Sequence, residues 1–253
     1  MTQISEKFFN VRSLRPFEVF LIGGIFALSL SQTLITGNFD TIGTLSALCG
    51  VICVVLGAKG SMANWAFGIV ECFLYAYICL KGHIYGDAIQ RIFYTLPMQF
   101  VGWYMWSHRR RSDDHSIVQT RIMSWAQRVF WLIVIAACTW LMAWVLGTYG
   151  HYIQEFLSSH VFEGSYVKVD YTRPLQLYMD AFTTVVMMVA MYISTRAYAD
   201  QWILWIAINV LSVCIWMQNL GADEHAFMTM SKYALYFINS IYGLVNWWRL
   251  SKK

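Results

Sequence analysis

The residues best suited to chemistry are polar side chains inside long apolar segments of the sequence. Asn209 lies near the middle of segment 201–219, and Trp205 precedes it by four residues, which places both on one helical face. An asparagine amide donates and accepts hydrogen bonds, and an indole offers a flat surface for stacking. The pair therefore suits a flat ligand that carries an amide. A hydrogen bond between helices, worth about 1 kcal/mol, is the alternative role for Asn209.

Further candidates lie on one face of segments 87–106 and 227–248. Gln99 and Asn239 stand near the middle of these segments, where their amides can bind hydroxyl groups or a carboxamide. Together with acidic and aromatic residues at similar depth they form the predicted binding set. The candidates are Glu71, Tyr94, Gln99, Trp205, Asn209, Tyr236, Asn239 and Ser240.

Four charged residues inside or beside the apolar segments need a role, because charge is costly at that depth. Glu71 is central in segment 62–80. It either balances a positively charged ligand ring, stays protonated in a coupling role, or makes a structural hydrogen bond. Arg91, Asp180 and Lys232 lie nearer the segment ends. They predict either a charged gate or structural pairing.

Three residue types in the same segments predict local features: a proline predicts a bend, two glycines predict close helix contacts, and two tryptophans lie near segment ends. Pro97 lacks a backbone N–H, so we expect it to kink its helix and act as a hinge. Gly102 and Gly243 favour close helix packing. Trp106 and Trp247 lie near segment ends, where tryptophan usually anchors a helix at the membrane surface.

The elements that must position these residues are membrane-spanning helices. The sequence is 58% hydrophobic and 13% charged, and a spanning helix needs roughly 20 mostly apolar residues. An all-α integral membrane protein with eight spans is predicted. The segments are about 17–36, 42–58, 62–80, 87–106, 127–147, 174–196, 201–219 and 227–248.

Composition and motifs exclude several classes of function. The net charge of +4 is small and scattered, which excludes nucleic-acid binding. No phosphate-binding loop and no H-E-x-x-H or G-x-S-x-G motif is present, so the sequence predicts no enzyme. The six cysteines lack metal-ligand spacing, and no metal or cofactor is expected. A membrane-embedded enzyme and a receptor or scaffold stay as rival classes.

The basic residues predict the orientation. Thirteen of the eighteen lysines and arginines fall on one side of the eight predicted spans, including the run 109–111. Cytoplasmic loops carry the excess of Lys and Arg, so both termini are predicted to be cytoplasmic.

The sequence contains a weak internal repeat. Each copy begins with an amide residue followed by tryptophan and ends with a glycine four residues before a tryptophan. One segment separates the copies, so both run in the same direction, which is an arrangement found in transporters. The matching positions are Asn64, Trp65, Gly102 and Trp106 in the first copy, and Gln201, Trp202, Gly243 and Trp247 in the second.

These segments, in this order and spacing over roughly residues 42–250, resemble the PnuC nicotinamide riboside transporter family, which is related to the SWEET sugar carriers. The resemblance rests on Asn64-Trp65-Ala66-Phe67-Gly68, Gly102-Trp103-Tyr104-Met105-Trp106, the segment from Asp180 to Arg196, and Gln201-Trp202-Ile203-Leu204-Trp205 with Asn209.

The resemblance implies two parallel three-helix repeats joined by a linker helix, which is a 3+1+3 fold. This sequence departs from that pattern by an additional first span at about 17–36. The resemblance also implies a homotrimer in the bacterial cytoplasmic (inner) membrane that takes up nicotinamide riboside by facilitated diffusion through alternating access, with a cytoplasmic kinase trapping the product. Thiamine or riboflavin as substrate, and proton coupling, are the alternatives. The parts are 1–41 (extra helix), 42–106 (first repeat), 107–173 (linker) and 174–253 (second repeat).

Overall fold

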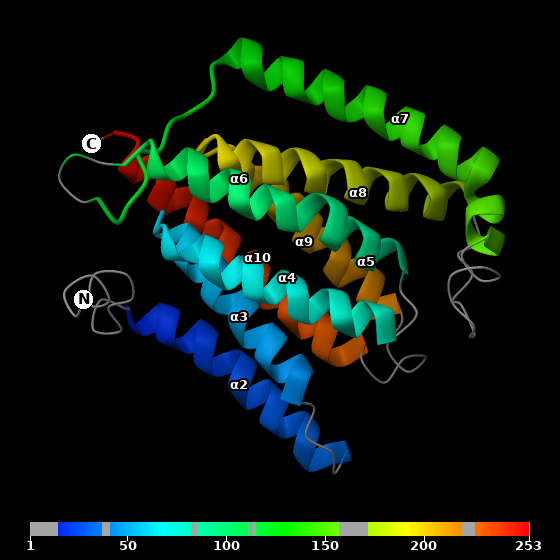
Figure 1. The fold of residues 1–253 in the computed structure, drawn as a ribbon, viewed down its shortest axis with the longest axis horizontal. Helices are drawn as coiled ribbons and strands as arrows, with labels where there is room; N and C mark the ends of the chain where they lie inside the picture. The colour runs from blue at the N-terminus through cyan, green and yellow to red at the C-terminus, as the bar shows by residue number, and fades with distance from the viewer. Residues whose placement is uncertain are drawn as a thin grey trace.

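The computed structural model describes residues 15–36, 41–81, 85–110, 112, 115–156, 172–218 and 226–252, and their regular structure is helical (Figure 1). The helices are α2 (Pro16–Thr36), α3 (Thr41–Ala58), α4 (Ala63–Lys81), α5 (Tyr85–Gln90), the π-helix η2 (Arg91–Thr95), α6 (Leu96–Ser107), α7 (Trp125–Phe156), α8 (Pro174–Thr195), α9 (Gln201–Gln218) and α10 (Ala226–Leu250).

Two of the predicted segments differ in form from the observed helices. Segment 87–106 consists of α5, η2 and α6 in succession, and Pro97 lies in the first turn of α6. A proline cannot donate to the carbonyl four residues earlier, and the wider π turn directly before it accommodates that missing bond. Helix α7 runs to Phe156, nine residues beyond the predicted end of segment 127–147. Hydropathy indicates where a helix leaves apolar surroundings, and polar residues continue this helix further.

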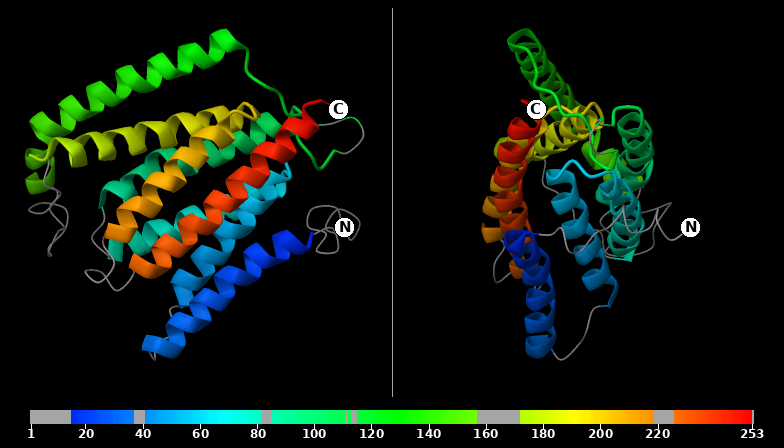
Figure 2. Two further views of the ribbon diagram at one scale, coloured as in Figure 1. Left: turned by 180° about the vertical axis from the view of Figure 1, so that it is seen from behind. Right: turned by 90° about the vertical axis from the view of Figure 1, so that its left-hand side faces the viewer.

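Consecutive long helices alternate in direction along one bundle (Figure 1). Helix α7 packs along α8 at one edge, and α2 lies at the opposite edge against α3 and α10 (Figure 2). The start of α2 and the end of α10 lie at the same end of the bundle. The α3–α4 and α9–α10 pairs make extensive contacts, and α3 also packs on α10 while α6 packs on α8.

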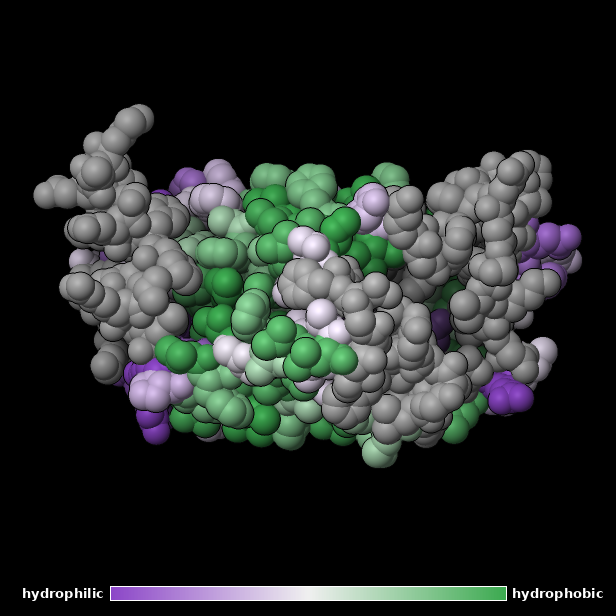
Figure 3. Space-filling model, turned by 90° about the horizontal axis from the view of Figure 1, so that it is seen from below, coloured by the Kyte–Doolittle hydropathy of each residue, from purple (hydrophilic) through white to green (hydrophobic). Residues whose placement is uncertain are grey.

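The outer surface carries many apolar side chains. On α7, Phe130, Leu132 and Trp140 are each more than half exposed. The view from below shows hydrophobic residues across the middle of the molecule and hydrophilic ones toward its two ends (Figure 3). Among the described residues, three helices are long and apolar enough to cross a membrane by length and composition, and three shorter ones are apolar. The three are Thr41–Ala58, Trp125–Tyr152 and Leu177–Thr195.

Two turns at one end of the bundle each contain a residue with a positive φ angle. Gly60, between α3 and α4, has φ 71°, and Ala197, between α8 and α9, has φ 58°. The segment before α7 binds both turns: Val118 N donates to Gly60 O at 2.9 Å, and Arg121 N donates to Ala197 O at 3.0 Å. This segment therefore ties the two helical turns together.

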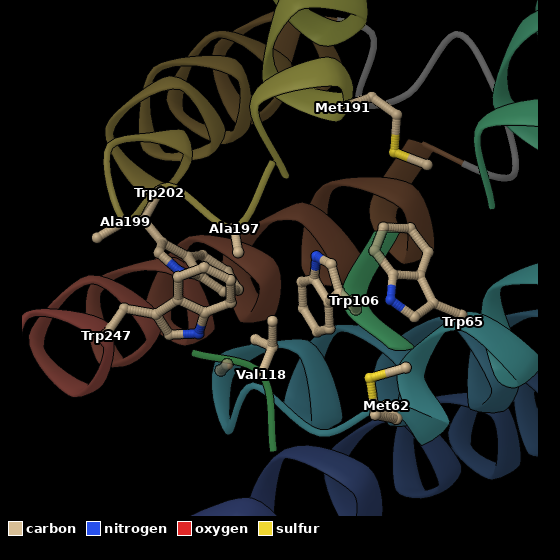
Figure 4. Close-up of a cluster of buried hydrophobic side chains, with 10 residues drawn as sticks. Met62, Trp65, Trp106, Val118, Met191, Ala197, Ala199, Trp202 and Trp247 are labelled. Carbon is tan, nitrogen blue, oxygen red and sulfur yellow. The ribbon is translucent and has the colours of Figure 1, made fainter. Parts of the chain in front are cut away.

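Four indoles form the buried core next to these turns (Figure 4). The Trp65 and Trp106 ring centroids are 4.9 Å apart, those of Trp106 and Trp247 5.5 Å, and those of Trp202 and Trp247 6.0 Å. Trp106 and Trp247 are 1% and 0% exposed. Their predicted role as surface anchors is therefore wrong. That prediction considered depth along the helix, whereas the helical face turns both rings inward.

Candidate functional site

A cavity of about 180 Å³ lies inside the bundle, and side chains from α3, α4, η2, α6, α8, α9 and α10 line it. A buried water needs about 10–15 Å³, so this space can hold an organic molecule of many atoms. The wall mixes apolar, aromatic, amide and charged groups. Such a cavity is the expected form of a small-molecule site.

Most of the predicted binding residues line this cavity. The wall contains seven of the eight candidates and two of the predicted gate residues, Arg91 and Lys232. The seven are Glu71, Tyr94, Gln99, Trp205, Asn209, Tyr236 and Ser240. They come from α4, η2, α6, α9 and α10, so only the folded bundle brings them together.

Three other predicted residues lie elsewhere. Asn239 is 1% exposed and its Nδ2 donates to Val54 O at 3.0 Å, across the contact of α10 with α3. Pro97 is exposed on the outer face of α6. Asp180 is partly exposed on α8, and its carbonyl accepts a bond from Thr183 Oγ1 at 3.1 Å.

Two buried side-chain amides, those of Asn209 and Gln99, differ in how many hydrogen bonds the protein makes with them. Asn209 Nδ2 donates to Ser240 Oγ at 3.0 Å, and that hydroxyl donates to Tyr236 O at 2.8 Å. Gln99 Nε2 has only a long contact of 3.9 Å to Cys72 Sγ, and Gln99 Oε1 has no partner among the described residues. An unpaired buried polar group costs about 1–3 kcal/mol, so Gln99 leaves hydrogen-bonding capacity unused in the cavity wall.

Charge concentrates in one part of the wall. Glu71 Oε2 lies 3.0 Å from Arg91 Nη1, which makes an ion pair between α4 and η2. The Arg91 guanidinium lies 4.6 Å and the Lys232 ammonium 5.1 Å from the centroid of the Tyr75 ring. One carboxylate, two cations and an aromatic face therefore stand together, and the carboxylate partly offsets the two positive charges.

The structure adds polar residues that were not among the predicted binding residues. Asn64 and Gln201 line the cavity, as do Trp65 and Trp202. Asn64 Oδ1, Gln201 Nε2 and both indole Nε1 atoms are buried without partners among the described residues. The amide–tryptophan pair that begins each repeat was the signal that could have identified them.

Two tryptophans also lie in the cavity wall, at its contact with the aromatic core. Trp106 Nε1 donates to Ser194 O and Trp247 Nε1 donates to Gly57 O, each at 2.9 Å. These bonds join α6 to α8 and α10 to α3. With the four packed indoles, they form the base of the cavity on the side of the two turns.

Apolar helices around an internal cavity lined with amides and indoles define the chain as a helical membrane transporter, and comparisons identify its family. A family model described as "Nicotinamide mononucleotide transporter" matches residues 40–249. The chain belongs to this family, whose members are transporters and not enzymes. Helix α2 precedes the matched region.

Individual relatives agree with this family. The nicotinamide riboside transporter PnuC of Neisseria mucosa is 31% identical over 212 residues, which covers 83% of this chain and 73% of that protein. PnuC of Haemophilus influenzae is 26% identical over 240 residues, covering 94% and 92%. A crystal structure of the vitamin B3 transporter PnuC has the same fold, with a TM-score of 0.70 at 24% identity and coverage of 100% and 98%.

Proposed function

We propose that this protein is a facilitative carrier that takes up nicotinamide riboside. The observation that carries the proposal is the cavity whose wall holds buried amide and indole groups without partners in the described part of the chain. The relatives of this chain are named for the same substrate. Nicotinamide riboside combines a flat cationic ring, a carboxamide and ribose hydroxyls. The cavity wall offers aromatic faces for the ring, amides for the carboxamide and the hydroxyls, and a carboxylate for the positive charge.

Named residues have distinct proposed roles. Trp205 stacks on the nicotinamide ring, and Asn209 and Gln99 bind its carboxamide. Asn64 and Gln201 bind the ribose hydroxyls with the polar atoms that lack protein partners. Glu71 offsets the positive charge of the ring.

The proposed arrangement in the membrane is eight spans with both termini in the cytoplasm. Helices α3, α4 and α5–α6 form the first repeat, and α8, α9 and α10 form the second. Helix α7 joins them, and α2 is an additional span. The repeats move against each other, so that the cavity opens to one side of the bacterial inner membrane at a time.

Net uptake in this proposal needs no ion or nucleotide. A cytoplasmic kinase phosphorylates the substrate and keeps its inward gradient, and the carrier works as a homotrimer. Gln99, Trp205 and their neighbours come from one chain, so each subunit has its own cavity.

The decisive test is counterflow with purified protein in liposomes. Vesicles loaded with unlabelled nicotinamide riboside should accumulate the labelled compound transiently, and a protonophore should leave the rate unchanged. Thiamine and riboflavin, loaded in parallel, test the alternative substrates. Counterflow of riboflavin or thiamine alone would contradict the proposed substrate, and no counterflow of any of the three would contradict the proposed carrier function.

Replacing Glu71 with glutamine should raise KM for nicotinamide riboside about tenfold, because the carboxylate that pairs with Arg91 and would offset the charge of a cationic ligand is lost. At about 10 Å and an effective dielectric of 20, one charge contributes about 1.7 kcal/mol. Uptake kinetics at fixed pH measure the change. The double variant Glu71→Gln/Arg91→Gln should recover part of the loss, and a KM equal to that of the parent in the single variant would argue against an electrostatic role.

A further inference from the structure

The two repeats meet along two seams, one between α3 and α10 and one between α6 and α8. Each seam has one indole bond at equivalent positions: Trp247 Nε1 to Gly57 O in the α3–α10 seam, and Trp106 Nε1 to Ser194 O in the α6–α8 seam. The seams share this bond, and they differ in the side chains beside it.

Two asparagines add bonds to the α3–α10 seam. Asn239 Nδ2 donates to Val54 O at 3.0 Å, and Asn246 Nδ2 donates to Ala58 O at 2.9 Å. Both bonds run from a side chain of one repeat to the backbone of the other. Asn239 is 1% exposed, so breaking its bond would leave a buried amide without its partner, at a cost of about 1–3 kcal/mol.

Methionines occupy the equivalent positions of the α6–α8 seam. Met98 corresponds to Asn239 and Met105 to Asn246 by the spacing that aligns the two terminal tryptophans. Met98 packs against the cluster that contains Met191 of α8. Thioether side chains are flexible and make no directional bond, so this packing can rearrange at low cost.

The α6–α8 seam is continued by the π-helix η2. Tyr94 Oη donates from η2 to Met188 O of α8 at 2.6 Å. A single π turn is a local departure from α-helical bonding and is often found at functional sites. Pro97 follows directly and leaves the helix without a bond at this point.

Helix α2 strengthens the opposite seam. Glu18 is 0% exposed, and its carboxylate accepts bonds from Lys59 Nζ at 3.0 Å and from Tyr242 Oη at 2.7 Å. Lys59 directly follows α3, and Tyr242 belongs to α10. One buried carboxylate therefore connects both repeats across the α3–α10 seam, and the α6–α8 seam has α7 packed on α8 instead.

We propose that the α3–α10 seam is the fixed axis of transport and that the α6–α8 seam opens, with Glu18 as the positioning residue that holds the axis. This rests on the proposed alternating-access function. The α3–α10 seam, with its two asparagine bonds and Glu18, keeps its contacts through the cycle. The methionine-lined α6–α8 seam gives up its Trp106 and Tyr94 bonds and separates at the π turn to admit the substrate.

Cross-links at equivalent positions of the two seams test this. In a chain with all six cysteines replaced, Ala58→Cys/Asn246→Cys joins the α3–α10 seam, and Thr195→Cys/Met105→Cys is the matched pair in the α6–α8 seam. A protease site inserted within 157–171 separates the halves unless a disulfide joins them, so a non-reducing gel measures the cross-linked fraction. Val54→Cys/Asn239→Cys and Met191→Cys/Met98→Cys are the second pairs.

The expected result is unequal between the seams. Oxidised protein linked across α3–α10 should keep at least about 50% of the counterflow rate of the reduced protein, because a factor of two is only about 0.4 kcal/mol in the barrier. Protein linked across α6–α8 should lose at least about tenfold, or about 1.4 kcal/mol, and a reductant should restore it. Reversible inhibition by the α3–α10 link, or normal transport with the α6–α8 link, would overturn the proposal.

Glu18 is tested by replacement and rescue. Glu18→Ala should lower the maximal counterflow rate about tenfold with unchanged substrate affinity, because Lys59 and Tyr242 lose their shared partner. The Glu18→Gln protein should have a maximal counterflow rate between those of the parent and of the Glu18→Ala protein. The α3–α10 cross-link in the Glu18→Ala background should restore the rate, which a general folding defect would not allow. Failure of that rescue contradicts the positioning role, whereas absence of counterflow by the unmodified protein contradicts the proposed function.

Discussion

Replacing Gln99 with leucine is expected to lower nicotinamide riboside affinity about 10–100-fold, which corresponds to one lost polar contact of about 1–3 kcal/mol. Gln99 is 7% exposed, lines the cavity and has a carbonyl oxygen without a partner among the described residues. Leucine has a similar size, so the folded protein itself loses little. Isothermal titration and uptake kinetics measure the affinity, and thermal unfolding of the ligand-free protein should give an unchanged or higher Tm.

A matched control separates binding from general polarity. Gln127→Leu makes the same chemical change at an exposed residue whose Nε2 binds Tyr198 Oη at 3.2 Å, and it should leave affinity unchanged. Parent-like affinity in the Gln99→Leu protein would assign Gln99 to helix packing instead of the ligand.

Replacing Gly102 with alanine should destabilise the protein by about 1–3 kcal/mol or more, the usual cost of overpacking a core. A Cβ at this position would overlap the Trp65 ring, which is 1% exposed and packed edge-on against Trp106. Relieving this overlap requires a packed, buried ring to move, which disturbs the four-indole core. For a chain of this size, the corresponding fall in Tm is about 2–12 °C.

The equivalent glycine and an open one provide the controls. A Cβ at Gly243 would lie 2.6 Å from the Trp202 ring, so Gly243→Ala should behave like Gly102→Ala. Gly23 on α2 has nothing within 4 Å of an added Cβ, and Gly23→Ala should leave Tm unchanged or slightly higher. Thermal unfolding followed by tryptophan fluorescence measures all three variants. Tm values equal to that of the parent would show that the Trp65 and Trp202 rings move to make room for the added Cβ.

Hydropathy alone located the helices well, because each apolar segment must satisfy its own backbone bonds as a helix in lipid. The segment ending at residue 147 in the prediction continues to Phe156, since the end of an apolar run does not end a helix. The π turn at Arg91–Thr95 was not predicted. Its cause includes packing against α4 and α8, which no local sequence pattern describes.

The polar residues that line the cavity were predictable to the extent that polarity inside an apolar segment is costly. That reasoning found Gln99 and Asn209, which line the cavity. It also selected Asn239, whose amide binds a backbone carbonyl of α3. Depth and polarity are the same for a ligand-facing amide and an interhelical one, so they cannot separate the two.

By itself the sequence determined an all-helical membrane protein with amides and indoles inside its apolar segments, because these follow from local composition and spacing. Only the tertiary structure decided which of these side chains share a cavity, that Trp106 and Trp247 are core residues, and that Glu18 joins α3 to α10. Those properties depend on the rotation of each helix about its axis and on contacts between distant segments. Packing between helices sets both.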